Sequence, residues 1–189
     1  MDLANQRGVE TDVYQPAEDS QLLAEAACDR LDERDLVLEV GTGSGYVATR
    51  IAEETGSRVI ASDVNPHALE QARGDAVEPV QADLVSPFAN DVFDAVVFNP
   101  PYLPTESENE WDDWMERALS GGEDGREVID PFLDAVGRVL APDGLVLLLV
   151  SSLTGVDEVV GRAGENGFSA VAVADESFPF ETLTVLELL

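Results

Sequence analysis

Short apolar runs of strand length alternate along this chain with segments in which apolar residues recur at helical spacing. Strands separated by helices form βαβ units, whose parallel strands share one sheet with helices on its faces. The expected strands cover seven runs, at 36–40, 58–62, 77–82, 93–98, from 144 onward, 169–174 and 182–188. The expected helices cover 16–31, 45–54, 66–73, 127–140 and 156–164.

This alternation predicts an α/β fold with a seven-stranded, doubly wound and mostly parallel sheet. The last two strands follow one another without a helix between them, which also fits an open, doubly wound sheet. Ligands of such sheets bind at the carboxyl ends of the strands, near the point where the strand order reverses. No repeat or linker divides the chain, and we expect residues 1–189 to form a single domain.

The charge of the chain is its most unusual compositional feature. Its 39 acidic and 10 basic residues give a formal net charge of −29, and every basic residue is an arginine. Self-repulsion of this size destabilises a compact fold in dilute buffer, whereas at about 1 M salt the Debye length falls to about 3 Å. The charge therefore predicts a salt-rich cytoplasm and a halophilic source. An acidic disordered chain is rejected because hydrophobic residues make up 44% and fall into regular segments.

Other features of the composition exclude several classes of protein. No window approaches the roughly 18 consecutive apolar residues of a membrane span, and the first residues lack the pattern of a signal peptide. Cys28 is the only cysteine, which excludes an internal disulfide and a cysteine-rich metal site. We expect a cytoplasmic protein that contacts no membrane and holds no metal.

A glycine-rich turn directly follows the first buried strand and opens a helix. Glu39 precedes a Gly-x-Gly-x-Gly pattern at Gly41, Gly43 and Gly45. Glycine permits a tight turn and lets a ligand approach the main-chain amides. Asp63 ends the next strand, where its carboxylate can accept hydrogen bonds from both hydroxyls of a ribose. The combination predicts a nucleotide-type ligand at this turn.

Asp83 and Leu84 follow the third expected strand, at the same edge of the sheet. At that place they would face the adenine of a nucleotide ligand. The assignment of this dipeptide depends on the glycine turn beside it.

A second motif, Asn99-Pro100-Pro101-Tyr102, directly follows the buried strand 93–98. Two prolines end the strand and prevent an immediate helix, so the Asn99 amide and the Pro100 carbonyl stay at the sheet edge. Two acceptors of this kind can orient the N–H groups of a planar amide or amine, whose delocalised lone pair makes it a poor nucleophile. Tyr102 can pack flat on such a group. The motif predicts transfer to a nitrogen of an amide or amine.

Several further residues have simpler interpretations. His67 follows a proline at a helix start and is expected to be a surface or capping residue, and Cys28 a small buried side chain. Trp111 and Trp114 lie in an acidic stretch, where they either pack the loop down or contact a protein substrate. The acidic run 106–116 is interpreted either as a solvated surface or as a charge that repels nucleic acid from the site.

Three segments together resemble the glutamine methyltransferases of the HemK/PrmC type. They are the segment 14–20, with Tyr-x-Pro-Ala-Glu-Asp-Ser, the Asn99 motif, and the segment 120–126, with Ser-Gly-Gly-Glu-Asp-Gly-Arg. The similarity runs over nearly the whole chain. The chain has no room for the extra N-terminal helical domain of the bacterial members, so it is most similar to the short archaeal and eukaryotic branch.

The resemblance implies a Rossmann-like class I fold, S-adenosylmethionine as cofactor, and methylation of the glutamine in the Gly-Gly-Gln motif of a translation termination (release) factor. It also implies a heterodimer with a small zinc-binding methyltransferase activator protein. By the family pattern, the cofactor site is lined by Ser20, Glu39, Gly41, Asp63, Asp83 and Leu84, to which the turn adds Gly43 and Gly45. The glutamine amide is held by Asn99, Pro100 and Tyr102, with Pro101 beside them.

Three other functions stay open. A methyltransferase acting on the exocyclic amine of adenine uses a similar motif, but the chain has neither a basic stripe nor a second domain, so we do not expect a nucleic-acid partner. A protein-lysine methyltransferase would need a pocket for another extended nitrogen side chain. A cofactor-binding scaffold without activity would leave the Asn99 motif without a role.

Overall fold

Seven strands lie in one sheet, as the alternating pattern predicts. They are β1 (Leu36–Val40), β2 (Arg58–Asp63), β3 (Val77–Gln81), β4 (Phe93–Phe98), β5 (Leu140–Ser151), β6 (Ala170–Ser177) and β7 (Thr182–Leu188). Their order is β3-β2-β1-β4-β5-β7-β6; β1 to β5 pair in parallel, and β7 is antiparallel to both β5 and β6. The structure is a computed structural model and describes residues 13, 15–72, 74, 76–105 and 114–189.

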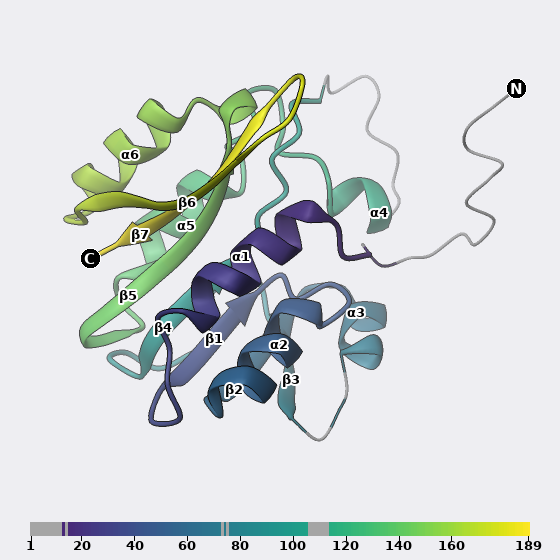
Figure 1. Cartoon of the computed structure of the whole chain (residues 1–189), viewed down its shortest axis with the longest axis vertical. Coiled ribbons are helices and arrows are strands. Elements are labelled where there is room, and N and C mark those ends of the chain that lie inside the picture. The colour runs from purple at the N-terminus through teal and green to yellow at the C-terminus, as the bar shows by residue number, and fades with distance from the viewer. Residues whose placement is uncertain (1–12, 14, 73, 75, 106–113) are drawn as a thin grey trace, which may run out of the picture.

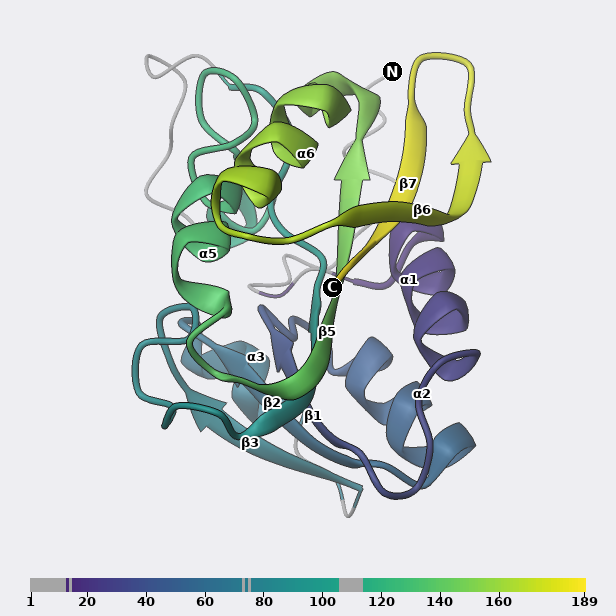
Figure 2. The same cartoon turned by 90° about the vertical axis from the view of Figure 1, so that its left-hand side faces the viewer.

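Helices cover both faces of this sheet. They are α1 (Glu18–Cys28), α2 (Tyr46–Thr55), α3 (Pro66–Gln71), α4 (Trp114–Arg117), α5 (Ile129–Val136) and α6 (Val156–Glu165), with a 3₁₀ turn η3 at Ser152–Thr154. Helices α1 and α2 lie on one side of the sheet and α5 and α6 on the other (Figures 1 and 2). The doubly wound architecture is thus confirmed. None of the helices within the described residues is long and apolar enough to cross a membrane.

The two faces of the sheet build two apolar cores, because successive side chains of a strand point to opposite faces. Val37 belongs to the core that contains Ile51 of α2. Its neighbour Leu38 belongs to the core that contains Phe132 of α5. A strand that is buried on both faces has a continuous run of apolar residues in its sequence. The central strands were recognisable in the sequence for this reason.

The helix expected over 127–140 ends earlier in the structure, at its C-terminal end. Helix α5 ends at Val136, and β5 begins at Leu140 instead of near residue 144. The carbonyl oxygen of Val139 accepts the N–H groups of Val92 and Phe93 at 2.9 and 3.0 Å, so this segment already pairs beside β4. Val139 and Leu140 keep the apolar pattern because they enter the same core as the helix.

Helix α4 lies in the stretch 104–125, for which the sequence predicted no element. It is one turn long and carries Trp114 at its start and Arg117 at its end. In Figure 1 it lies near the beginning of α1, on the side where the parallel strands end. Trp111 and residues 106–113 fall outside the described residues.

Candidate active site

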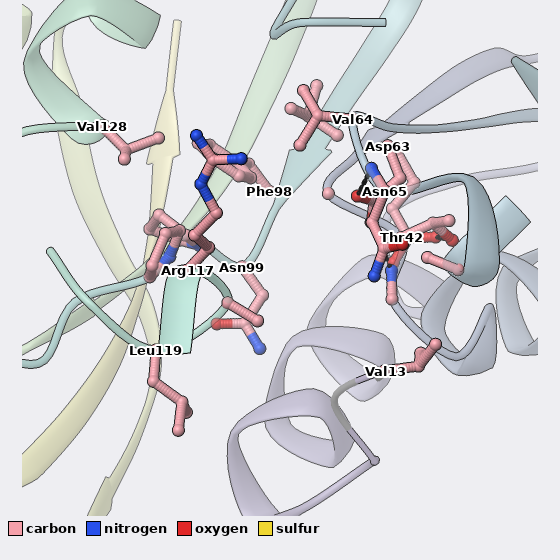
Figure 3. Close-up of a pocket in the computed structure, with 18 of the residues that line it drawn as sticks. Val13, Thr42, Asp63, Val64, Asn65, Phe98, Asn99, Arg117, Leu119 and Val128 are labelled. Atoms are coloured by element: carbon pink, nitrogen blue, oxygen red, sulfur yellow. Dashed lines mark hydrogen bonds between the residues drawn. The ribbon is translucent and has the colours of Figure 1, made fainter. Parts of the chain in front are cut away.

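A cavity of about 920 Å³ opens at the carboxyl ends of the parallel strands. The loops that follow β1, β2, β3 and β4 line it, together with α1 and α4 (Figure 3). Eleven residues that the sequence indicated line this cavity: Ser20, Glu39, Gly41, Gly43, Asp63, Asp83, Leu84, Asn99, Pro100, Pro101 and Tyr102. The structure therefore brings together residues that are up to 82 positions apart in the chain.

Gly45 is the indicated glycine that does not line the cavity. It precedes α2 with a φ of 79°, and a Cβ placed on it would lie 2.8 Å from the Cα and Cβ of Ala72. Its lack of a side chain lets the start of α2 lie close to the end of α3. Gly41 does line the cavity, and its φ of 64° favours glycine.

Asp63 is held in place by the main chain at the end of β2. Its carboxylate accepts the N–H groups of Gly43 and Asn65, both at 2.9 Å. Burial raises the pKa of this carboxyl, while the two hydrogen bonds act in the opposite direction. Each carboxylate oxygen keeps a lone pair, so Asp63 can still accept hydrogen bonds from a bound ligand.

Glu39 is a buried acid beside the same turn, with 3% of its surface exposed. Its carboxyl accepts the hydroxyl of Thr42 and the N–H of Ala48. Burial, with a smaller contribution from the nearby charge of Asp63, raises the pKa of Glu39 to about 8 against the opposing effect of the two hydrogen bonds. A carboxyl of this kind is mostly neutral at pH 7 and gains its charge readily when a cation binds beside it.

Helix α1 and the Asn99 motif are joined by a partly buried contact. The hydroxyl of Tyr102 donates to Oδ2 of Asp19 at 3.4 Å, and the N–H of Ser20 donates to Oδ1 of the same carboxylate at 2.6 Å. The pKa of Tyr102 is raised by burial and by the charges of Asp19 and Glu181. The Tyr102 hydroxyl thus stays protonated and is held toward the start of α1.

Asn99 has a buried acceptor atom without a partner. Its Oδ1 is buried, and no donor among the described residues reaches it. An unsatisfied buried acceptor costs about 1–3 kcal/mol, so such an atom calls for a ligand that donates to it. Asn99 lies across the cavity from Thr42 and Asp63 in Figure 3. One wall thus carries the turn after β1 and the end of β2, and the other carries the Asn99 motif.

Comparisons with known proteins agree with this geometry. The family described as "Methyltransferase domain" matches residues 37–121. The human methyltransferase HEMK2 is 36% identical over 195 residues, which cover 96% of this chain and 91% of that protein. A protein of Methanocaldococcus jannaschii, whose name places it with the N5-glutamine methyltransferases, is 36% identical over 93% of this chain and 90% of its own length. The chain belongs to the HemK2/PrmC-type family of protein N5-glutamine methyltransferases.

A solved structure is similar to this methyltransferase over almost its full length. It is Mtq2 from the E. cuniculi Mtq2–Trm112 complex, with a TM-score of 0.78 and 32% identity over 94% of this chain and 98% of that one. That complex is described as responsible for methylation of the termination factor eRF1. The class I S-adenosylmethionine-dependent methyltransferase fold expected from the sequence is thereby confirmed.

Several residues of the cavity were not among the indicated site residues. Examples are Val13, Asp19, Thr42, Asn65, Phe98, Trp114, Arg117, Leu119 and Val128. Asp19 and Trp114 had been noticed in their segments but not assigned to a site. Among the residues with simpler interpretations, His67 is exposed and Asn65, not His67, caps α3. Cys28 is only half-buried.

Proposed function

We propose that this methyltransferase transfers a methyl group from S-adenosylmethionine to the side-chain amide nitrogen of glutamine in the Gly-Gly-Gln motif of a translation termination factor. The observation that carries this proposal is the buried Oδ1 of Asn99, which no donor reaches among the described residues. A primary amide supplies such a donor and also presents the nitrogen to be methylated. The substrate described for the similar Mtq2 complex supports the same acceptor.

The residues of the opposite wall fit S-adenosylmethionine. Asp63 would accept the ribose hydroxyls, and Asp83 and Leu84 would flank the adenine. Glu39 is a buried acid without an arginine among its described partners, which suits a ligand with positive charge. Ser20, Gly41 and Gly43 would surround the amino-acid part. When bound, the cofactor supplies an electrophilic methyl group on a sulfonium.

The acceptor wall would orient a weak nucleophile. Oδ1 of Asn99 and the carbonyl oxygen of Pro100 would accept the N–H groups of the glutamine amide, so that nitrogen electron density points toward the methyl group. Tyr102, held by Asp19, would pack on the amide plane. Proximity and orientation then supply most of the acceleration. No general base is needed before transfer, because the methylated amide cation is acidic enough to lose its proton to water.

The proposal also covers the setting of the enzyme. A small zinc-binding activator protein would form a heterodimer with the chain, which the Trm112 subunit of the similar complex supports. A net charge of −29 with arginine as the sole basic residue type supports a halophilic source. Translation places a termination-factor methyltransferase in the cytoplasm. The expectation of one domain over residues 1–189 remains a prediction.

The test is transfer of labelled methyl in molar potassium chloride, with and without the activator. The acceptors are a termination factor with Gly-Gly-Gln, the same factor with Gly-Gly-Asn, and total RNA. We expect label on the Gly-Gly-Gln factor alone. Asn99→Ala should lower the transfer rate about 10²–10³-fold and leave cofactor affinity unchanged. Label on RNA, or equal label on both factors, would refute the proposed acceptor.

A further inference from the structure

Arg117 is the one basic residue among the described residues that line the cavity. The other charged residues of the lining are all acidic: Asp19, Glu39, Asp63, Asp83 and Glu127. A single cation in an otherwise acidic cavity is not explained by the composition of the chain, which disfavours basic residues everywhere. Its position therefore calls for a separate explanation.

Arg117 also differs from the other described arginines in its contacts. Six of them pair with carboxylates: Arg30, Arg34, Arg50, Arg58, Arg126 and Arg162. Arg138 donates to the carbonyl oxygens of Val85 and Phe88. For Arg117 no hydrogen bond or ion pair to a described residue occurs, and its side chain is exposed. None of the residues that the structure describes therefore occupies its guanidinium donors.

A neighbouring ring orients this guanidinium. Its central carbon lies 5.5 Å from the centre of the Trp114 ring, which is one turn earlier in α4 and also lines the cavity. A cation over an aromatic face is attracted by the ring, and arginine keeps its planar set of donors in that arrangement. Arg117 therefore needs little additional ordering to bind an oxygen ligand.

The wall on which Arg117 lies indicates which ligand it meets. In Figure 3 it lies on the same side as Asn99 and Leu119, across the cavity from Thr42 and Asp63. The carboxylate of a cofactor would lie at the glycine turn, on the opposite side.

We propose that Arg117 binds the acceptor loop by donating hydrogen bonds to main-chain carbonyl oxygens beside the modified glutamine. This inference rests on the proposed function. Glycines that precede a glutamine carry no side chains, so their carbonyl oxygens are the accessible polar atoms of that segment. The planar set of donors on arginine can reach two such oxygens at once. Arg117 would then select an extended, glycine-flanked acceptor, while Asn99 holds the reacting amide.

The test compares Arg117→Ala with Arg34→Ala in molar potassium chloride. Arg34 pairs with Asp32 before β1, at the opposite end of the sheet from the cavity, and its removal changes the net charge equally. We expect Arg117→Ala to raise the KM for the termination factor about tenfold, with kcat within about twofold and cofactor Kd unchanged. Arg34→Ala should leave all three values unchanged, and Arg117→Lys should restore only part of the loss.

Other outcomes separate the two proposals. An unchanged KM in Arg117→Ala, or a weaker cofactor affinity in that variant, would overturn the role of Arg117 while leaving the proposed function intact. A KM for the termination factor that is normal in Arg117→Lys would contradict the proposal that arginine donates to two carbonyl oxygens at once. Failure of the unmodified enzyme to label the termination factor would refute the proposed function and this inference with it.

Discussion

Cofactor binding should be coupled to the charge of Glu39. The buried carboxyl has its pKa raised to about 8, from an ordinary value of 4.5. At pH 7 about one molecule in ten carries the charge, and ionising the rest costs about 1.4 kcal/mol. A sulfonium and an ammonium bound nearby favour the carboxylate, so we expect S-adenosylmethionine to bind as Glu39 loses its proton.

The expected size of this coupling follows from the pKa. Below the pKa that Glu39 has in the cofactor-free enzyme, each pH unit changes the ionised fraction of its carboxyl about tenfold. The cofactor Kd should therefore fall about tenfold between pH 6 and pH 7. This window avoids the cofactor amino group, since α-amino groups titrate near pH 8. Calorimetric titration at pH 7, in two buffers with different ionisation enthalpies, should show release of about 0.9 proton per cofactor bound.

Glu39→Gln is the matched variant, because it keeps the shape of the side chain and removes its titration. Its cofactor Kd should be flat between pH 6 and pH 7, with no proton released. S-adenosylhomocysteine, which lacks the sulfonium charge, should show a smaller pH dependence with the unmodified enzyme. A cofactor Kd that does not change between pH 6 and pH 7, with no proton released on binding to the unmodified enzyme, would refute this coupling. Glu39 would then have the same charge in the free and the cofactor-bound enzyme.

Three further outcomes can be measured on the purified protein. The raised pKa of Glu39 contributes stability that is fully present below pH 4.5 and is lost as pH rises through about 8. The Tm of the cofactor-free protein should therefore fall from pH 6 to pH 9. The same fall should be smaller in Glu39→Gln. Asp63→Ala should weaken cofactor binding at least tenfold by equilibrium titration, and normal affinity would exclude Asp63 from the cofactor site. Gly45→Ala should lower the free energy of unfolding by about 2–4 kcal/mol, because it combines a left-handed φ with a 2.8 Å approach to Ala72. Both free energies of unfolding are measured by urea titration. Gly161→Ala is the control: Gly161 lies in α6 with open space around it, so this substitution should leave the free energy of unfolding unchanged or raise it.

The order of the elements was predictable because the central strands are buried on both faces. Their apolar runs are continuous, and the helices between them show one apolar side. The end of α5 was not predictable from periodicity, since Val139 and Leu140 enter the same core from the start of β5. Helix α4 has a single turn, which is too short for a periodic signal.

The cavity was predictable where its residues follow strands. Asp63 ends β2 and Asn99 follows β4, the two strands that flank β1 in the parallel part of the sheet, and topology alone brings such ends to one edge. The contact between Asp19 and Tyr102 was not predictable, because no local pattern reports how α1 crosses the sheet. Arg117 was missed for a related reason: its significance lies in the absence of a partner among the described residues, which sequence does not record.

The exposed charges of this chain and the buried charges of its cavity respond differently to salt. Exposed pairs such as Arg34 with Asp32 lie in water, where about 1 M salt reduces the Debye length to about 3 Å. Glu39 is screened far less because it is 3% exposed and its interactions pass through protein. The pH dependence of cofactor affinity should therefore persist between about 0.1 M and 3 M salt. Stability, which includes repulsion among many exposed acids, should instead rise steeply over the same range.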